Sequence, residues 1–430
     1  MSSDQAVPNR SAASKQGRAS DLRGRLFETR ALSRKLAEPL SDEDQVVQAM
    51  DDASPTKWHL GHTTWFFESF LLGELDKNYK HFDDDFAYCF NSYYEGKGER
   101  HPRPFRGLLT RPGADAVRAY RAYIDDALEQ LFDNGELDDR ALDIIELGIN
   151  HEQQHQELLL TDILSLFASQ PLRPAYRKAA ISEADKAYAT KFIAFEGGIV
   201  EAGHAGNGFS YDNEMPRHEV LLRPFKLADR CVTKGEWLDF IADGGYETPA
   251  LWLSDGWAMV KEEGWRAPLY WEDHDGAWRQ MTLAGIRPID PAAPVAHVSY
   301  YEADAFARWA GKRLPTEFEW EHASQDVAEE GRTLGSEAFR PSPAGKPDGS
   351  LKQMFGDIWE WTQSSYSPYP GYEVPKGAVG EYNGKFMCSQ FVLKGASCAT
   401  PDGHSRRTYR NFFYPHQRWQ FMGLRLAEDQ

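Results

Sequence analysis

The chain has 430 residues, of which 41% are hydrophobic and 13% aromatic, so it can form two or three folded domains. Its formal net charge of −18 argues against nucleic acid or an anionic membrane as a partner. No apolar run approaches the roughly 18 to 20 residues of a membrane span, and the polar N-terminus lacks the apolar segment of a secretory signal, so we expect a cytoplasmic protein.

The cysteines do not indicate a disulfide framework or a cysteine-ligated metal. There are four, at Cys89, Cys231, Cys388 and Cys398, and none belongs to a C-x-x-C pair. Few, widely separated cysteines in a long chain are typical of free thiols in a reducing compartment.

The N-terminal part predicts a helical bundle. Residues 1–18 are expected to be a disordered tail and residues 19–170 the bundle. Amphipathic segments predict helices over 21–36, 115–132 and 141–167, and a further helix with Ser54 as N-cap and Pro55 at its first position. Residues 76–113 form a long Gly-, Pro-, Arg- and Tyr-rich connection, and a loop of this length is usually functional.

The C-terminal part has a different composition. Residues 171–190 read as a linker. Residues 191–430 contain short alternating segments, frequent Gly and Pro, and many of the 13 Trp residues. This pattern favours an α+β or irregular β domain, so the fold class is α+β and multidomain.

Histidines carry the strongest local signal for chemistry. In His151-Glu-Gln-Gln-His155 the two imidazoles share one helix face, because residues i and i+4 point the same way. His62, in Trp58-x-x-Gly-His62, is a third candidate, and His59 could compete with it. Ligands from facing bundle helices converge on one point, and three neutral nitrogens leave open positions on an octahedral iron.

A rival interpretation of the same motif is a zinc hydrolase. The string matches H-E-x-x-H, in which Glu152 would act as the general base. The third ligand of the extended zincin motif is absent, because residues 156–162 contain neither Gly nor His.

Taken together, these motifs resemble a known family, the iron-dependent sulfoxide synthases of ergothioneine biosynthesis (EgtB). The histidine motifs resemble its N-terminal DinB-like four-helix bundle. The C-terminal half is similar to the formylglycine-generating-enzyme fold, a C-type-lectin variant. The matching stretches are Phe195-Glu-Gly-Gly, Asn213-Glu-Met-Pro-Arg-His-Glu-Val, Pro294-Val-Ala-His-Val-Ser-Tyr, Gly311-Lys-Arg-Leu-Pro-Thr-Glu-Phe-Glu-Trp and Gly356-Asp-Ile-Trp-Glu-Trp.

The resemblance implies an O2-dependent reaction that joins a thiol to the imidazole of hercynine, the trimethylated betaine of histidine, and yields a sulfoxide. It implies Fe(II) as cofactor, with His62, His151 and His155 as ligands. Copper-dependent formylglycine formation is not expected, because Thr400 and Ser405 stand where formylglycine-generating enzymes carry their two cysteines. A lectin-like, non-enzymatic binding module remains an alternative.

The resemblance also implies roles around the metal. A proton donor is expected at Tyr94 or Tyr93, with Tyr94 favoured. Contacts to the sulfur donor and to hercynine are expected from Arg103, Arg106, Gln154, Asn411, Phe412 and Phe413.

The sulfur donor itself is expected to be cysteine. Relatives that use γ-glutamylcysteine resemble this chain around R-N-W-D-F-P, but here Phe413 replaces the Asp and Gln417 a following arginine. Both losses remove charged partners of a glutamyl group, although Arg418 could substitute for Gln417. The tyrosine pair resembles the type II, cysteine-using branch.

Overall fold

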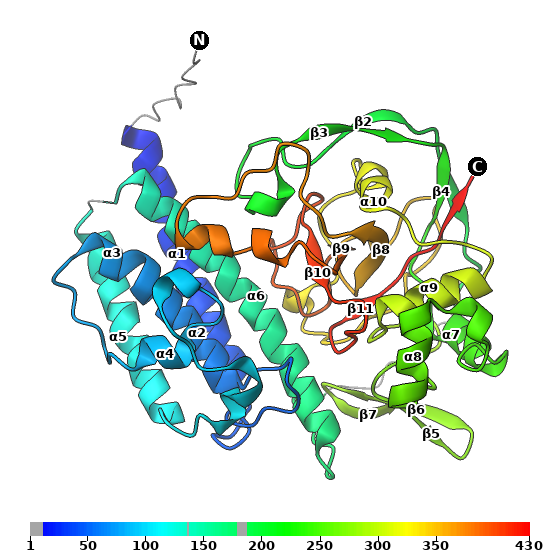
Figure 1. Cartoon of the computed structure of the whole chain (residues 1–430), viewed down its shortest axis with the longest axis horizontal. Coiled ribbons are helices and arrows are strands. Elements are labelled where there is room, and N and C mark those ends of the chain that lie inside the picture. The colour runs from blue at the N-terminus through cyan, green and yellow to red at the C-terminus, as the bar shows by residue number, and fades with distance from the viewer. Residues whose placement is uncertain (1–11, 136, 179–186) are drawn as a thin grey trace. The chain divides into compact units, whose positions relative to one another are not determined.

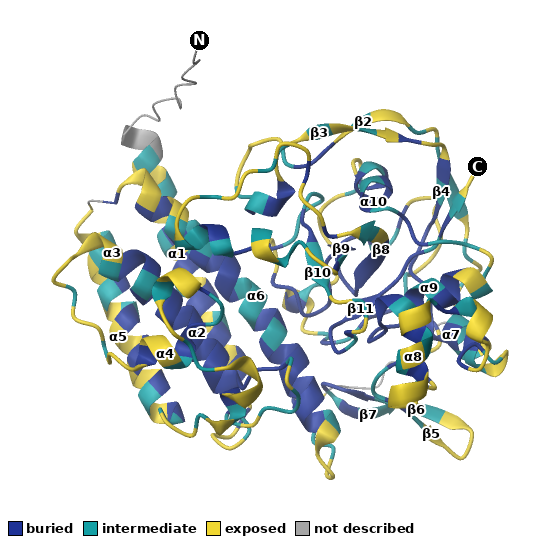
Figure 2. Ribbon diagram, viewed as in Figure 1, coloured by how far each residue is buried: buried dark blue, intermediate teal, exposed yellow. Residues whose placement is uncertain are grey.

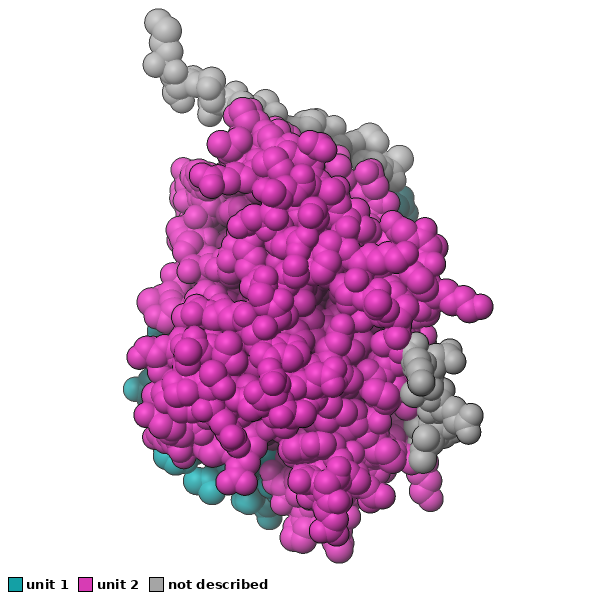
Figure 3. Space-filling view, turned by 90° about the vertical axis from the view of Figure 1, so that its right-hand side faces the viewer, with its two compact units in different colours: residues 1–159 teal, residues 160–430 magenta. Residues whose placement is uncertain are grey.

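The structure, a computed structural model, describes residues 12–135, 137–178 and 187–430. The chain divides into two compact units, residues 1–159 and 160–430 (Figure 3). Unit 1 is helical and unit 2 mixes short strands with helices (Figure 1). No helix within the described ranges is long and apolar enough to cross a membrane.

Four long helices dominate unit 1, and α6 continues past its boundary. The helices in chain order are α1 (Ala12–Ala37), α2 (Thr56–Phe67), α3 (Gly73–Leu75), α4 (Phe86–Phe90), α5 (Ala114–Asp133) and α6 (Asp139–Ser169). A π-helical turn, Glu68–Leu72, follows α2, and the connection from α3 to α5 contains α4 and 3-10 turns at Glu95–Lys97 and Arg103–Leu108. The predicted helices are confirmed, with ends shifted by one or two residues for α5 and α6.

The start of α1 corrects the predicted tail. Helix α1 begins at Ala12, so residues 12–18 are helical, while residues 1–11 lie outside the described part of the chain. Arg18 explains part of this, because its guanidinium pairs with Asp143 at 2.8 Å and with Glu146 at 2.7 Å on α6.

Helix α2 also begins differently from the prediction. Pro55 is its N-cap, and the side chain of Ser54 does not cap it. The Ser54 hydroxyl instead accepts a hydrogen bond from Nη1 of Arg106 at 2.9 Å. A capping rule that considers only neighbouring residues could not predict this, because Arg106 is distant from Ser54 in the sequence.

All residues of α2 are buried (Figure 2). Two glycines allow this close packing. A Cβ at Gly61 would lie 2.3 Å from the ring of Phe90, and a Cβ at Gly148 would lie 2.4 Å from the ring of Phe67. Helix α2 therefore approaches both α4 and α6 more closely than any larger side chain would permit.

Unit 2 is built from small sheets. A four-stranded sheet has the order β10-β9-β8-β11, two three-stranded sheets have the orders β1-β4-β12 and β5-β6-β7, and β2 pairs with β3. The strands are β1 (Phe192–Phe195), β2 (Gly198–Ala202), β3 (His218–Leu222), β4 (Phe225–Ala228), β5 (Trp271–His274), β6 (Ala277–Thr282), β7 (Gly285–Pro288), β8 (Trp359–Ser365), β9 (Phe391–Gly395), β10 (Asn411–Phe413), β11 (Met422–Gly423) and β12 (Ala427–Asp429).

The helices of unit 2 are short, and three of them begin with a capping box. They are α7 (Lys234–Ala242), α8 (Ser254–Glu263), α9 (Tyr300–Trp309) and α10 (Glu317–Ala323). In the core, the fully buried Arg425 and Glu360 pair at 2.8 Å, and the indole of Trp320 donates to the same carboxylate at 2.9 Å. Ion pairs of this kind fix irregular segments that short strands alone would hold weakly.

Part of the predicted linker is packed into unit 2, to which it belongs. Tyr176 is buried, and the backbone N–H of Arg177 donates to the carbonyl of Leu283 at 3.0 Å. Residues 179–186 of that linker lie outside the described ranges.

Candidate metal centre

Two helices of unit 1 bring the predicted histidines together. Helix α2 carries His62, and α6 carries His151 and His155 one turn apart. One ring nitrogen from each of the three lies within 4.8 Å of the other two, and this is the group of metal-compatible side chains found among the described residues. The interhelical convergence that the bundle pattern predicts is therefore present.

Hydrogen bonding assigns the proton of His62. Its Nδ1 lies 2.6 Å from the backbone carbonyl oxygen of Phe90, which can only accept, so Nδ1 carries the hydrogen. The other nitrogen, Nε2, therefore offers its lone pair, and it lies 3.1 Å from Nε2 of His151. A carbonyl partner on the far nitrogen is the usual arrangement of a metal-ligating histidine.

Two tryptophans fix the plane of the His62 ring. The indole of Trp58 stacks on it with centroids 4.6 Å apart and planes 10° apart. The ring of Trp65 also stacks on it, with centroids 5.6 Å apart and planes 21° apart. The sequence motif indicated Trp58 but not Trp65, although both lie at helical spacing from His62.

The three imidazoles are held neutral. Burial lowers the pKa of His151 to about 3. Burial first, and the neighbouring imidazoles second, lower the pKa values of His62 and His155 well below 6.5. His62 and His151 are buried, whereas His155 keeps partial solvent exposure, so the cluster is not sealed on every side. Neutral imidazoles with free lone pairs are the form that binds a metal.

The donor set fits a divalent transition metal. Two Nε2 atoms 3.1 Å apart match adjacent ligands of one ion, because metal–nitrogen bonds are about 2.0–2.1 Å long. Imidazole suits iron, zinc, copper and nickel alike, so the geometry indicates a metal without selecting one.

Glu152, the glutamate of the H-E-x-x-H string, does not serve as a free base. Its carboxylate accepts hydrogen bonds from Arg121 and from Ser33 Oγ at 2.6 Å, and it pairs with Arg30 at 3.3 Å. The arginines lower the pKa of this buried carboxyl despite its desolvation. This network, which no sequence motif indicates, removes the residue on which the hydrolase interpretation depends.

The predicted tyrosines lie on the connection between α3 and α5. Tyr94 is fully buried, with its ring 5.8 Å from Trp65 and 4.9 Å from Phe70. Tyr93 is partly exposed, and the two hydroxyl oxygens are 3.5 Å apart. One indole, Trp65, thus contacts both the His62 ring and the Tyr94 ring.

The predicted arginines occupy different environments. Arg106 is buried, and its guanidinium lies 3.4 Å above the ring of Trp58, which in turn stacks on His62. Arg103 is exposed and donates to the carbonyl of Asp52. Gln154 lies on α6, partly exposed, between the two histidines of that helix.

The remaining predicted contacts belong to unit 2. Asn411, Phe412 and Phe413 form β10, pair with β9 and are partly exposed. Phe412 stacks on Tyr366 with ring centroids 4.1 Å apart, and Phe413 packs edge-on against Trp419 at 5.6 Å.

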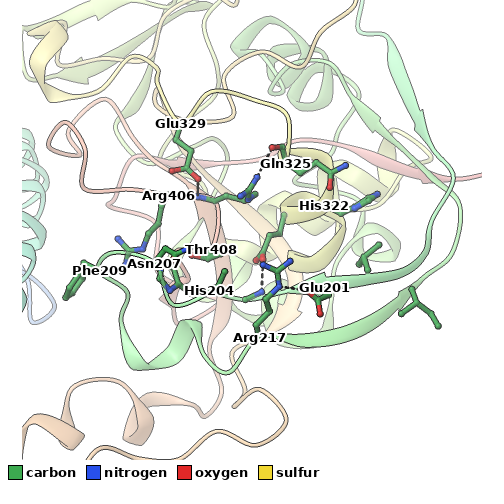
Figure 4. Close-up of a pocket in the computed structure, with 16 residues that line it drawn as sticks. Glu201, His204, Asn207, Phe209, Arg217, His322, Gln325, Glu329, Arg406 and Thr408 are labelled. Carbon is green, nitrogen blue, oxygen red and sulfur yellow. Dashed lines mark hydrogen bonds and ion pairs between the residues drawn. The ribbon is translucent and has the colours of Figure 1, made fainter. Parts of the chain in front are cut away.

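Unit 2 also contains a pocket of about 690 Å³ between the β2–β3 ribbon, the end of α10 and residues 406–408 (Figure 4). Its buried charges are compensated inside the unit, because Glu321 pairs with Lys394 at 3.2 Å and Arg406 pairs with Glu214. None of the predicted site residues lines it.

Comparison with known families agrees with the two-unit architecture. The DinB superfamily profile matches residues 25–159, and the profile of the sulfatase-modifying factor enzyme 1-like domain matches residues 177–430. The predicted fold class is confirmed.

Curated relatives cover most of the chain. It is similar to the hercynine oxygenase of Mycobacterium tuberculosis, with 34% identity over 66% of this chain and 71% of the relative. The hercynine oxygenase of Mycolicibacterium smegmatis is 36% identical over the same shares. The formylglycine-generating enzyme of Streptomyces coelicolor is 28% identical over 55% of this chain and 88% of its own length. On these likenesses and the matched domain order, the chain belongs to the hercynine oxygenase family.

Proposed function

We propose that the chain is an iron(II)- and O2-dependent sulfoxide synthase that joins the thiol of cysteine to the imidazole of hercynine. The observation that carries the proposal is the cluster of His62, His151 and His155, three neutral imidazoles that converge in a member of the hercynine oxygenase family. Relatives bearing that name support hercynine as substrate, and the donor set supports a metal.

The proposed reaction balances without an external reductant. One imidazole C–H bond and one thiol S–H bond are replaced by a C–S bond. One oxygen atom of O2 is placed on the sulfur, and the other leaves as water. The four electrons that reduce O2 come from the two substrates.

The three histidines would hold the iron through neutral nitrogens. Iron(II) held there would supply open coordination positions for a thiolate and for O2, and it would help to orient both substrates. The protein's own contribution is to keep the imidazoles deprotonated and fixed, through burial, the Phe90 carbonyl and the Trp58 and Trp65 rings.

Tyr94 is proposed as the proton donor, with Tyr93 as its neighbour. Trp65 contacts both the Tyr94 ring and the His62 ring, which supports a role near the metal. Tyr94→Phe should lower C–S coupling by about 10²- to 10⁴-fold, the usual contribution of an acid, and divert the thiol to a sulfinic acid. Product analysis by mass spectrometry measures both, and wild-type coupling in Tyr93→Phe and Tyr94→Phe alike would place the donor elsewhere.

Arg103 and Arg106 are proposed to bind the carboxylate of the sulfur donor. Ser54 and Trp58 hold the guanidinium of Arg106 in one orientation, which suits a bidentate contact. Gln154, Asn411, Phe412 and Phe413 are proposed to contact hercynine, whose quaternary ammonium has no N–H to donate and therefore suits aromatic faces.

Cysteine is proposed as the donor in preference to γ-glutamylcysteine. Near β10, Arg418 pairs with the buried Glu302 at 2.9 Å and donates to the carbonyl of Ala267. The side-chain oxygen of Gln417 accepts from the backbone N–H of Tyr414 at 3.0 Å. These contacts weaken the case for Arg418 as a substitute partner of a glutamyl group.

Donor choice is tested by comparing kcat/KM for the two thiols at equal hercynine and O2. We expect cysteine to be preferred, because each charged group of the glutamyl moiety left without a partner costs several kcal/mol, roughly, when buried. A preference for γ-glutamylcysteine would contradict the assignment of Phe413 and Gln417.

The function as a whole is tested by anaerobic loading with iron(II), addition of hercynine and cysteine, and admission of O2. The expected product has the summed mass of both substrates plus one oxygen and minus two hydrogens. Peptide hydrolysis with zinc and no coupling with iron would favour the hydrolase. Ligand binding without turnover under any metal would favour a lectin-like binding module.

A further inference from the structure

A fourth histidine of unit 1, His59, contacts His155 of the cluster. His59 lies on α2 three residues before His62 and is buried. Its Nδ1 is 2.8 Å from Nδ1 of His155, and the two ring centroids are 5.1 Å apart. Since His155 directs this nitrogen to His59, its other nitrogen, Nε2, is the one available to a metal.

Two imidazole nitrogens at this distance require one proton between them. If His155 Nδ1 carries the hydrogen and His59 Nδ1 accepts it, the lone pair of His155 is on Nε2. If His59 donates instead, the hydrogen of a neutral His155 is on Nε2, and that nitrogen cannot bind a metal. The direction of one hydrogen bond therefore determines whether His155 is a competent ligand.

We propose that His59 is a positioning residue that accepts the Nδ1–H of His155 and so fixes the tautomer in which His155 Nε2 binds the metal. This inference rests on the proposed metal centre and extends it by one residue. The Phe90 carbonyl performs the same task for His62, at 2.6 Å from its Nδ1. The two ligands thus receive different acceptors, a backbone carbonyl and a side chain.

A ligand role for His59 itself fits the geometry less well. Its Nδ1 is engaged with His155, and the group of nitrogens within 4.8 Å of one another consists of His62, His151 and His155. A purely packing role is the remaining alternative, because a buried ring between α2 and α6 also fills space.

Two substitutions of His59 distinguish a role as hydrogen-bond acceptor from a role in packing. In His59→Asn, the amide oxygen lies about where Nδ1 lies, two bonds from Cβ, and can accept the same hydrogen. In His59→Leu, the volume is largely kept but the acceptor is lost. A positioning role makes Leu the more damaging change, whereas a packing role makes Asn the more damaging change, since it is smaller and polar.

The readout is the affinity of the full chain for zinc(II), measured by chelator competition, with cobalt(II) absorption as a second probe. We expect His59→Leu to weaken binding by about 10- to 100-fold, as the loss of a hydrogen-bond partner of a metal ligand does, and His59→Asn to retain most of the affinity. His101→Leu is the control, because the ring of His101 contacts Tyr88 and the Phe105 carbonyl. Binding at least as tight in the Leu variant as in the Asn variant would overturn the proposal.

A measurement on the unmodified protein keeps the test independent of variant folding. In zinc-loaded protein labelled with ¹⁵N-histidine, His155 should show a protonated Nδ1 and a metal-bound Nε2. A metal-bound or deprotonated Nδ1 would overturn the assignment of His59. Failure of the wild type to bind zinc, cobalt or iron would instead refute the metal centre itself.

Discussion

Buried ionisable groups serve different purposes in the core of unit 2 and in the histidine cluster of unit 1. In unit 2, cations and carboxylates are matched, as in Arg425–Glu360 at 2.8 Å and Arg410–Glu317 at 2.8 Å. At the centre of unit 1, three imidazoles face one another and stay neutral. The matched charges hold irregular segments in place, whereas the neutral imidazoles leave lone pairs for a cation. The difference separates burial that serves the fold from burial that serves the site.

The largest expected effect comes from removing a member of the imidazole cluster. His62→Ala, His151→Ala and His155→Ala should each reduce O2-dependent coupling by more than the roughly 10- to 100-fold loss that is typical when only a hydrogen-bond partner of a metal ligand is removed. Helical circular dichroism should remain close to that of the wild type. Wild-type turnover in any one variant would remove that residue from the ligand set.

Buried ion pairs from the two units should differ in their consequences for the site. Glu152→Gln leaves Arg121 without its carboxylate partner and Arg30 with Asp125 as its remaining one, and Glu360→Gln leaves Arg425 without its carboxylate partner. Each change should lower the free energy of unfolding by about 3–5 kcal/mol, measured by urea denaturation.

Metal affinity then distinguishes the two positions. Glu152 adjoins His151 on α6, so its loss should also weaken metal binding by about tenfold, whereas Glu360→Gln should leave the affinity unchanged. Unaltered stability with complete loss of activity in Glu152→Gln would contradict this account and revive the hydrolytic base.

A smaller effect is expected from pH. An unfolded histidine takes up a proton near pH 6.5, but the pKa of buried His151 is about 3. The unfolded state therefore binds more protons between these values. The contribution of the buried neutral ring to the free energy of unfolding is therefore complete above pH 6.5 and is lost as the pH falls toward 3.

For the metal-free protein, each such histidine should lower the free energy of unfolding by about 1.4 kcal/mol per pH unit in this window. His404 of unit 2, whose pKa burial also lowers to about 3, provides the comparison. His151→Gln and His404→Gln should each remove the contribution of one histidine from the pH dependence of the free energy of unfolding. Urea unfolding at about pH 7 and about pH 5 measures this dependence. A pH-independent stability of the metal-free wild type would contradict the neutral state of the cluster.

Helical periodicity predicted much of unit 1 because its signals are local. The predicted helix over 115–132 is observed as Ala114–Asp133, and the spacing of His151 and His155 already placed both rings on one face. The partners of these residues could not be predicted, since Glu152 meets Arg30 across 122 residues and His59 meets His155 across 96. Ser54 illustrates the same limit, because a distant arginine takes the hydroxyl that a local rule assigns to capping.

For unit 2, the sequence predicted the presence of a domain but not its individual strands. Its strands have two to seven residues, too few to give a clear alternation, and pairs such as β8 with β11 join segments about 60 residues apart. Resemblance to known motifs supplied the fold that periodicity could not. The contacts of Arg418 and Gln417 became visible only in the folded chain.

The central claim is that the neutral cluster on α2 and α6 binds iron. It is tested most directly by counting iron(II) retained per chain after anaerobic loading and gel filtration of the wild type and of His155→Ala. We predict one iron per wild-type chain and none in the variant. Equal iron in both proteins, or no iron in the wild type, would contradict it.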